Sequence, residues 1–156
     1  MIVVADTSPL NYLIRLGHVG ALEVLYGRII IPHAVHDEML SLKAPPVVRA
    51  WALNPPSWLE LLSPSTVPKI ALPKLDPGET EALALAEELN ADWLLIDDEE
   101  GRNEAARRGL QTIGTLGILR DAHRANLLDL RVEIDRLRSL GFYVGQSLIA
   151  TLLASI

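Results

Sequence analysis

Short apolar runs separated by helix-like segments constrain the fold of this chain more than any other feature of its sequence. The clearest runs, Ile2–Ala5 and Trp93–Ile96, are apolar at every position. A continuous apolar run fits a strand that is buried on both faces, and such strands alternating with helices favour a parallel sheet. The sequence therefore predicts an α/β fold with a mainly parallel central sheet, whose strands lie at 2–5, 28–31, 58–62, 93–96 and 110–113.

Start and stop signals delimit the helices between these strands. Ser8 followed by Pro9 is typical of an N-cap and a first helical residue, and Gly17 is typical of a helix end. Prolines recur between 63 and 77, so we expect an extended surface connection there. The same signals predict helices at 9–16, 19–25, 33–42, 47–53, 79–89, 102–108, 115–126, 130–140 and 146–154.

Length and composition narrow the class of protein. The 156 residues fit a single domain, 1–156, in which we expect 141–156 to be a C-terminal helical extension that packs on the domain or on a partner. There is no cysteine and no pattern typical of a leader, and the apolar runs are far shorter than the roughly 20 residues of a membrane span. We therefore expect a cytoplasmic protein with no membrane partner.

The net charge of −6 excludes a protein that holds nucleic acid chiefly through lysine and arginine. If nucleic acid is the substrate, bound cations must invert part of that charge.

Acidic residues recur where predicted strands end or predicted helices begin. Because parallel strands end at the same edge of a sheet, these carboxylates can converge although some ninety residues separate them. Converging carboxylates raise each other's pKa unless a cation compensates them, and oxygen ligands without cysteine suit Mg²⁺ or Mn²⁺. Such an ion can activate a water for attack at phosphorus. The acids concerned are Asp6, Glu38, Glu79, Glu81, Asp97 and Asp98.

Each acid also has an ordinary structural explanation. Glu79 and Glu81 would complement the dipole of a helix, and Asp97 and Asp98 would serve as turn and N-cap residues. The histidines His33 and His36 have neither cysteine nor a further histidine nearby, so zinc is not expected.

The order and spacing of five motifs resemble the PIN-domain family. They are V-V-A-D-T-S-P-L-N-Y-L, I-P-x-x-V-x-x-E-M, L-D-P-G-E-T-E-A-L-A-L-A, L-L-I-D-D-E-E-G-R-x-x-A-x-x-x-G and I-G-T-L-G-I-L, which together cover residues 1 to about 125. The chain is similar to prokaryotic PIN-like nucleic-acid-binding proteins related to the toxins of type II toxin–antitoxin pairs. The resemblance implies a three-layer α/β/α fold, metal-dependent endoribonuclease activity on an RNA substrate, a homodimer and, for toxin members, a small antitoxin.

The resemblance also implies roles for individual residues. Asp6 matches the first aspartate of the family, Glu38 its helical glutamate and Asp98 its late aspartate, for which Asp97 remains an alternative. The third acid of the family is usually an aspartate that opens a helix and precedes alanine. Glu81 fits that place, with Glu79 as a near neighbour and additional metal ligand.

One position departs from the family pattern, because Ile96 stands where a threonine is usual. That departure and the glutamate in the third position favour an alternative, a non-catalytic PIN-like protein that binds nucleic acid or a partner. Candidate substrate-binding residues are Thr7, Ser8, Asn11 and Arg102, although capping explains Ser8 and a salt bridge explains Arg102 equally well.

Overall fold

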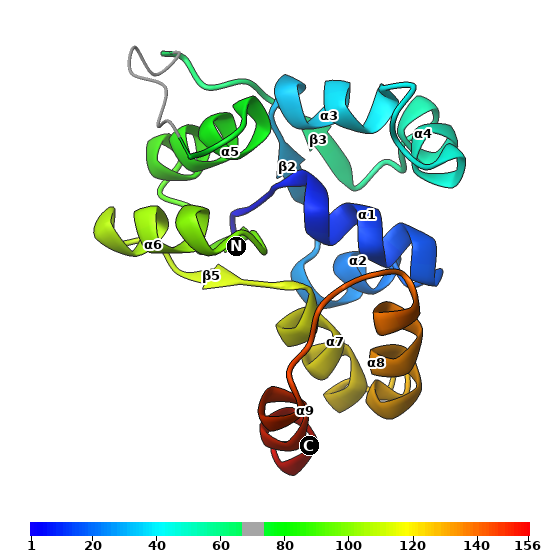
Figure 1. Cartoon of the computed structure of the whole chain (residues 1–156). Helices are drawn as coiled ribbons and strands as arrows, with labels where there is room; N and C mark the ends of the chain where they lie inside the picture. Colours follow the sequence, from blue (N-terminus) through cyan, green and yellow to red (C-terminus); the bar gives the residue numbers. More distant parts are fainter. Residues whose placement is uncertain (67–73) are drawn as a thin grey trace.

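The central sheet of the computed structural model is parallel and lies between two layers of helices (Figure 1). The structure describes residues 1–66 and 74–156, so the middle of the predicted connection, 67–73, lies outside the described residues. The strand order is β3-β2-β1-β4-β5, and every neighbouring pair is parallel. The predicted α/β fold is thereby confirmed, with β1 at Val3–Ala5, β2 at Ile29–Ile31, β3 at Leu59–Leu61, β4 at Trp93–Leu95 and β5 at Thr112–Ile113.

Successive side chains of each strand enter two separate cores, as the alternation of a strand requires. On one face Val4 and Leu94, which are partners in the sheet register, pack with Ile96 beneath two helices. On the other face Val3 and Ala5 join a larger core. The continuous apolar runs that predicted the strands therefore reflect burial on both faces.

Two helices, α5 (Pro77–Glu88) and α6 (Glu99–Arg107), supply the residues of the smaller core. The larger core is formed with the remaining helices, which lie on the other side of the sheet in Figure 1. No helix among the described residues is long and apolar enough to cross a membrane. The remaining helices are α1 (Thr7–Leu16), α2 (Ala21–Tyr26), α3 (His33–Leu40), α4 (Pro46–Leu53), α7 (Thr115–Arg124), α8 (Leu130–Ser139) and α9 (Gln146–Ala154).

The first helix begins earlier than the sequence predicts. Asp6, not Ser8, is the N-cap residue, and α1 starts at Thr7. The predicted cap at Ser8 is wrong because its hydroxyl donates to the Asp97 side chain at 2.7 Å instead of capping the backbone. Pro9 still lies in the first turn, where its missing N–H leaves no hydrogen bond unmade.

The C-terminal segment crosses the body of the molecule between α8 and α9. Phe142 packs edge-on against Tyr12 of α1, with ring centroids 5.0 Å apart, and Val144 is buried. Leu152 of α9 then enters the larger core. This part of the chain is therefore anchored to the domain at several points.

Candidate metal centre

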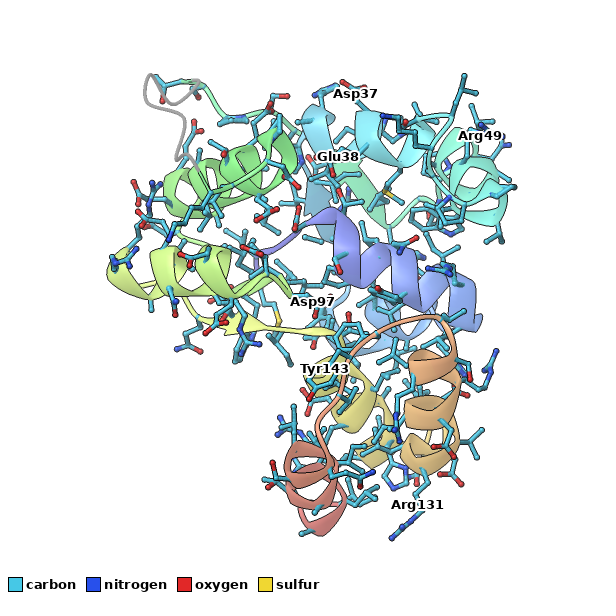
Figure 2. All side chains as sticks on the ribbon, in the orientation of Figure 1. Asp37, Glu38, Arg49, Asp97, Arg131 and Tyr143 are labelled. Atoms are coloured by element: carbon cyan, nitrogen blue, oxygen red, sulfur yellow. The ribbon has the colours of Figure 1, made fainter. Side chains whose placement is uncertain are left out.

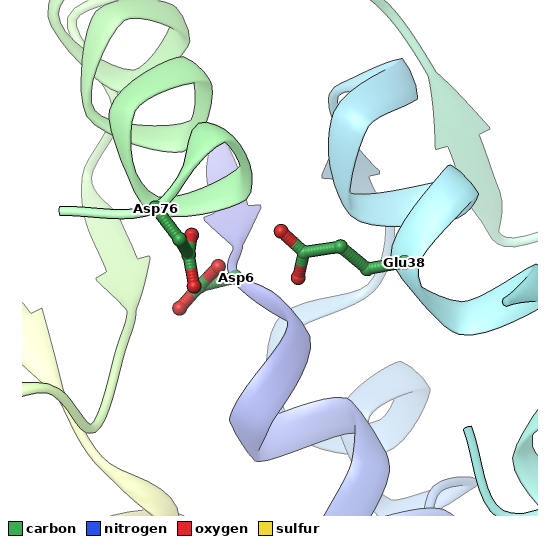
Figure 3. Close-up of side chains that lie close together, drawn as sticks. All are labelled: Asp6, Glu38 and Asp76. Atoms are coloured by element: carbon green, nitrogen blue, oxygen red, sulfur yellow. The ribbon is translucent and has the colours of Figure 1, made fainter. Parts of the chain in front are cut away.

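Three carboxylates from distant parts of the chain meet at the carboxyl edge of the sheet (Figure 3). Asp6 follows β1, Glu38 lies in the last turn of α3, and Asp76 precedes α5. One oxygen of each lies within 4.8 Å of the others. Asp6 is only 4 % exposed, whereas Glu38 is partly buried and Asp76 is exposed. The cluster is thus open to solvent on the Asp76 side.

Helix N-termini bring the acids together. Asp6, Asp76 and Asp98 are the N-cap residues of α1, α5 and α6, respectively. Asp76 accepts a hydrogen bond from the Glu79 backbone N–H at 2.7 Å, and Asp98 accepts one from the Gly101 N–H at 2.8 Å. The positive ends of three helix dipoles therefore face the cluster and offset part of the repulsion between its carboxylates.

Glu38 is held in place by its neighbours. The Thr7 hydroxyl donates to Glu38 Oε2, and the Gly78 backbone N–H donates to Oε1 at 3.0 Å. These two bonds join α3 to the starts of α1 and α5. The carboxylate is consequently oriented by the backbone elements that carry the other two acids.

The electrostatic cost of the cluster is largest at Asp6. Burial raises the pKa of Asp6 to about 7, and the charges of Asp76, Glu38 and Asp97 add to the rise, while the backbone N–H of Thr7 partly opposes it. The Oδ1 atom of Asp6 is buried and has no hydrogen-bond partner among the residues that the structure describes. A buried carboxylate oxygen without a donor is unfavourable unless a cation or a proton satisfies it.

Glu79 extends the acidic cluster along α5. Its Oε2 atom is buried without a partner in the described part of the chain, and Asp76 and Asp98 are its acidic neighbours. Burial, followed by these neighbours, raises the pKa of Glu79, and burial likewise raises the pKa of Glu38. At neutral pH the site therefore favours either added protons or an added cation.

Asp97 and Asp98 have different roles, which the sequence left open. Asp97 accepts hydrogen bonds from the Ser8 hydroxyl and from both the N–H and the hydroxyl of Thr115, each at 2.7 Å. Both oxygens of the Asp97 carboxylate therefore already accept hydrogen bonds from the protein. Asp98 accepts only its capping bond in the described part of the chain and is exposed.

An open cleft of about 790 Å³ lies over the acids. Most of the candidates named from the sequence line it, namely Asp6, Thr7, Ser8, Asn11, Glu38, Glu79, Asp97 and Asp98. Two do not. Glu81 lines a separate hollow that it shares with Glu38, His33 and Asp37, and Arg102 lines an adjoining groove. His33 and His36 bond to the Ser63 hydroxyl and the Ala52 carbonyl, respectively.

Asp76 is the cluster residue that the sequence interpretation missed. The signal was present, because Asp76 precedes Pro77 and Gly78 and so is an aspartate that opens a helix. Because the third acid of the family precedes an alanine and Glu81 does so here, the sequence predicts the third metal ligand one turn later, at Glu81. In the structure α5 begins two residues before its predicted start, and this makes Asp76 the N-cap.

Comparison with known proteins supports the fold. A solved PilT N-terminus domain protein, SSO1118 from the hyperthermophilic archaeon Sulfolobus solfataricus P2, superposes with a TM-score of 0.56 at 20 % identity, covering 78 % of this chain and 93 % of that one. The likeness establishes the fold alone. No match is found among curated protein sequences. A family model described as a PIN domain (DUF3368) matches residues 2–156. Since that match spans nearly the whole chain, the protein belongs to the PIN domain family.

Proposed function

We propose that this protein is a divalent-metal-dependent endoribonuclease. The observation that carries the proposal is the convergence of Asp6, Glu38 and Asp76, with a buried Asp6 oxygen that has no protein partner. PIN domains are generally nucleases that use divalent metals, and the acidic cleft occupies the edge of the sheet where ligands bind in open α/β folds.

The donor set fits a hard cation. Three carboxylates and no sulfur or imidazole favour Mg²⁺ or Mn²⁺ over zinc. Asp6, Glu38 and Asp76 would hold the ion, and Glu79 and Asp98 line the same cleft. When bound, the ion supplies charge stabilisation at the scissile phosphate and makes a coordinated water more acidic.

The protein's own residues position the reacting groups. Thr7 and Gly78 fix the Glu38 carboxylate, so it need not reorient when substrate arrives. Glu79, whose raised pKa means that it holds a proton in the metal-free site, would accept the proton that the attacking water releases once a bound cation has displaced its own. The hydroxyls of Thr7 and Ser8 donate to Glu38 and Asp97, which leaves Asn11, a residue that lines the cleft, as the candidate polar contact to substrate.

Cleavage of a labelled single-stranded RNA tests the proposal. With Mg²⁺ or Mn²⁺ we expect cleavage that EDTA stops and that Asp6→Asn lowers by at least about 100-fold. Asp37→Asn is the matched control, because Asp37 is an exposed acid next to Glu38 on α3 (Figure 2). Cleavage that survives both EDTA and Asp6→Asn would contradict the assigned site.

A second candidate function, binding of a protein partner without turnover, is favoured by the C-terminal helix. Leu148 and Ile156 are 46 % and 41 % exposed although they are apolar. Such a surface would suit a homodimer or a small antitoxin. The toxin role itself belongs to the endoribonuclease proposal, because such toxins act by cleaving RNA. Light scattering tests the homodimer directly: a monomeric mass in dilute solution would refute it, whereas Leu148→Asp should convert a dimer to a monomer.

A further inference from the structure

A second groove, of about 580 Å³, adjoins the acidic cleft. The two hollows share three lining residues, Asp97, Phe142 and Tyr143. The two hollows therefore lie on either side of Asp97 and of the segment that joins α8 to α9.

Tyr143 stands at the boundary between the cleft and the groove with its side chain in solvent (Figure 2). The residue is 89 % exposed, although Phe142 before it packs on Tyr12 and Val144 after it is buried. Both neighbours fix the backbone, so the ring is presented at a defined place. Packing within the described residues does not account for an aromatic side chain at this position.

Two arginines, Arg102 and Arg120, line the groove together with Asp97 and Asp121. Arg102 is exposed and forms no ion pair within 4.0 Å among the described residues. Arg120, the other arginine of the groove, is already paired with Asp121 at 3.4 Å. Arg102 therefore offers a planar guanidinium, with its donors available, beside an otherwise acidic site.

We propose that this groove binds an unpaired segment of single-stranded RNA next to the cleavage position, with a base stacked on Tyr143 and a phosphate on Arg102. Stacking on an exposed aromatic ring and a cationic contact to the backbone are the two elements of single-strand binding. The inference rests on the proposed function for its substrate. It adds that the enzyme selects unpaired RNA through residues outside the metal cluster.

Fluorescence anisotropy with a labelled single-stranded RNA, measured in Ca²⁺ in place of Mg²⁺ so that a divalent cation is present while hydrolysis is slow, tests the inference. We expect Tyr143→Ala to weaken binding about tenfold and Tyr143→Phe to leave it unchanged, because phenylalanine keeps the stacking face. Arg102→Gln should weaken binding and reduce the salt dependence of log K by about 0.7. Val24→Ala, an exposed apolar residue on α2, is the control that should change nothing.

The outcomes separate this inference from the proposed function. Equal affinity of the native protein and Tyr143→Ala, equal affinity for double-stranded RNA, or no binding at all would overturn the groove assignment, even if metal-dependent cleavage is found. Binding that depends on Tyr143 without any cleavage would sustain the groove and refute the nuclease. Photo-crosslinking of a 4-thiouridine-labelled strand should in addition place the crosslink in the peptide that contains Tyr143.

Discussion

Asp6 is the residue at which stability and function conflict. Its carboxylate is buried beside two other acids, and one of its oxygens has no donor. A group with these surroundings destabilises the metal-free protein whenever it is ionised. A bound cation would provide the partner that this carboxylate oxygen lacks, and this would explain why an acid is buried here.

Asp6→Asn should therefore stabilise the metal-free protein while it abolishes metal binding. Removing the buried charge should raise the free energy of unfolding at neutral pH by roughly 1–3 kcal/mol, as measured by urea denaturation in EDTA. The exposed replacement Asp37→Asn should change it by less than about 0.5 kcal/mol. A large loss of stability in Asp6→Asn would mean that the ionised carboxylate supports the fold.

Two variants at the start of α5 compare the third metal ligand that the structure indicates, Asp76, with the one that the sequence predicts, Glu81. Asp76→Asn should lower metal-dependent cleavage by at least about 100-fold, whereas Glu81→Gln should retain nearly all of it. Asparagine caps a helix as well as aspartate does, so Asp76→Asn should leave α5 intact, which circular dichroism can check. The reverse ranking of the two variants would return the third ligand to Glu81.

Sequence reasoning located Asp6, Glu38, Glu79 and Asp98 in the cleft but not Asp76, and it could not separate Asp97 from Asp98. Both difficulties have the same physical origin. Whether an acid caps a helix, binds protein donors or faces solvent depends on which hydroxyls and N–H groups lie nearby. Thr115, which donates two hydrogen bonds to Asp97, lies at the junction of β5 and α7. The sequence alone does not show that this junction lies beside Asp97.

Among the elements, the starts of α1, α5 and α6 define the cleft. All three helices begin earlier than their start signals predict, at Thr7, Pro77 and Glu99. Each shift turns an aspartate into an N-cap. The existence and order of the elements followed from apolar patterning. The caps of α5 and α6 are local bonds from Glu79 and Gly101, whereas Ser8 is kept from capping α1 by its tertiary bond to Asp97, which a single sequence does not display.

Asp97 joins three elements at this edge of the sheet: the end of β4, α1 through Ser8 and α7 through Thr115. Thr115→Val removes one donor from a buried position and leaves the Asp97 carboxylate under-satisfied. The free energy of unfolding should fall by about 1–3 kcal/mol. Urea denaturation measures this loss, and Ser139→Ala, on the exposed face of α8, provides a control.

If Thr115→Val leaves the free energy of unfolding unchanged, the hydrogen bonds of Asp97 do not stabilise the contact between these elements. In that case Asp97 would have to be reconsidered as a metal ligand in place of Asp98.

For the molecule as a whole, the acidic site makes the stability of the folded protein depend on pH and on metal binding. The pKa of Asp6 is raised from 3.8 to about 7 by folding, so between these values the folded protein retains a proton that the unfolded chain loses. The Asp6 contribution therefore lowers the stability of the metal-free protein as pH rises from about 4 to about 7. Glu79 and Glu38, whose pKa values are also raised, act in the same direction.

Unfolding by urea at about pH 5 and about pH 8 should show this effect. In EDTA the midpoint should be lower at the higher pH, and saturating Mg²⁺ should raise it most at that pH, because the cation replaces the protons. Asp6→Asn should reduce both the pH dependence and the effect of Mg²⁺. If stability instead rises with pH in EDTA, the folded protein must stabilise the ionised carboxylates, for example through cationic partners, and the raised pKa values would be contradicted.

The central claim, that the acidic cluster holds a divalent cation, is tested most directly by isothermal titration calorimetry with Mn²⁺ at neutral pH. We expect saturable binding by the native protein and by Asp37→Asn, with proton release when buffers of different ionisation enthalpy are compared, and no binding by Asp6→Asn. Undiminished binding by Asp6→Asn, or no binding by the native protein, would contradict this claim.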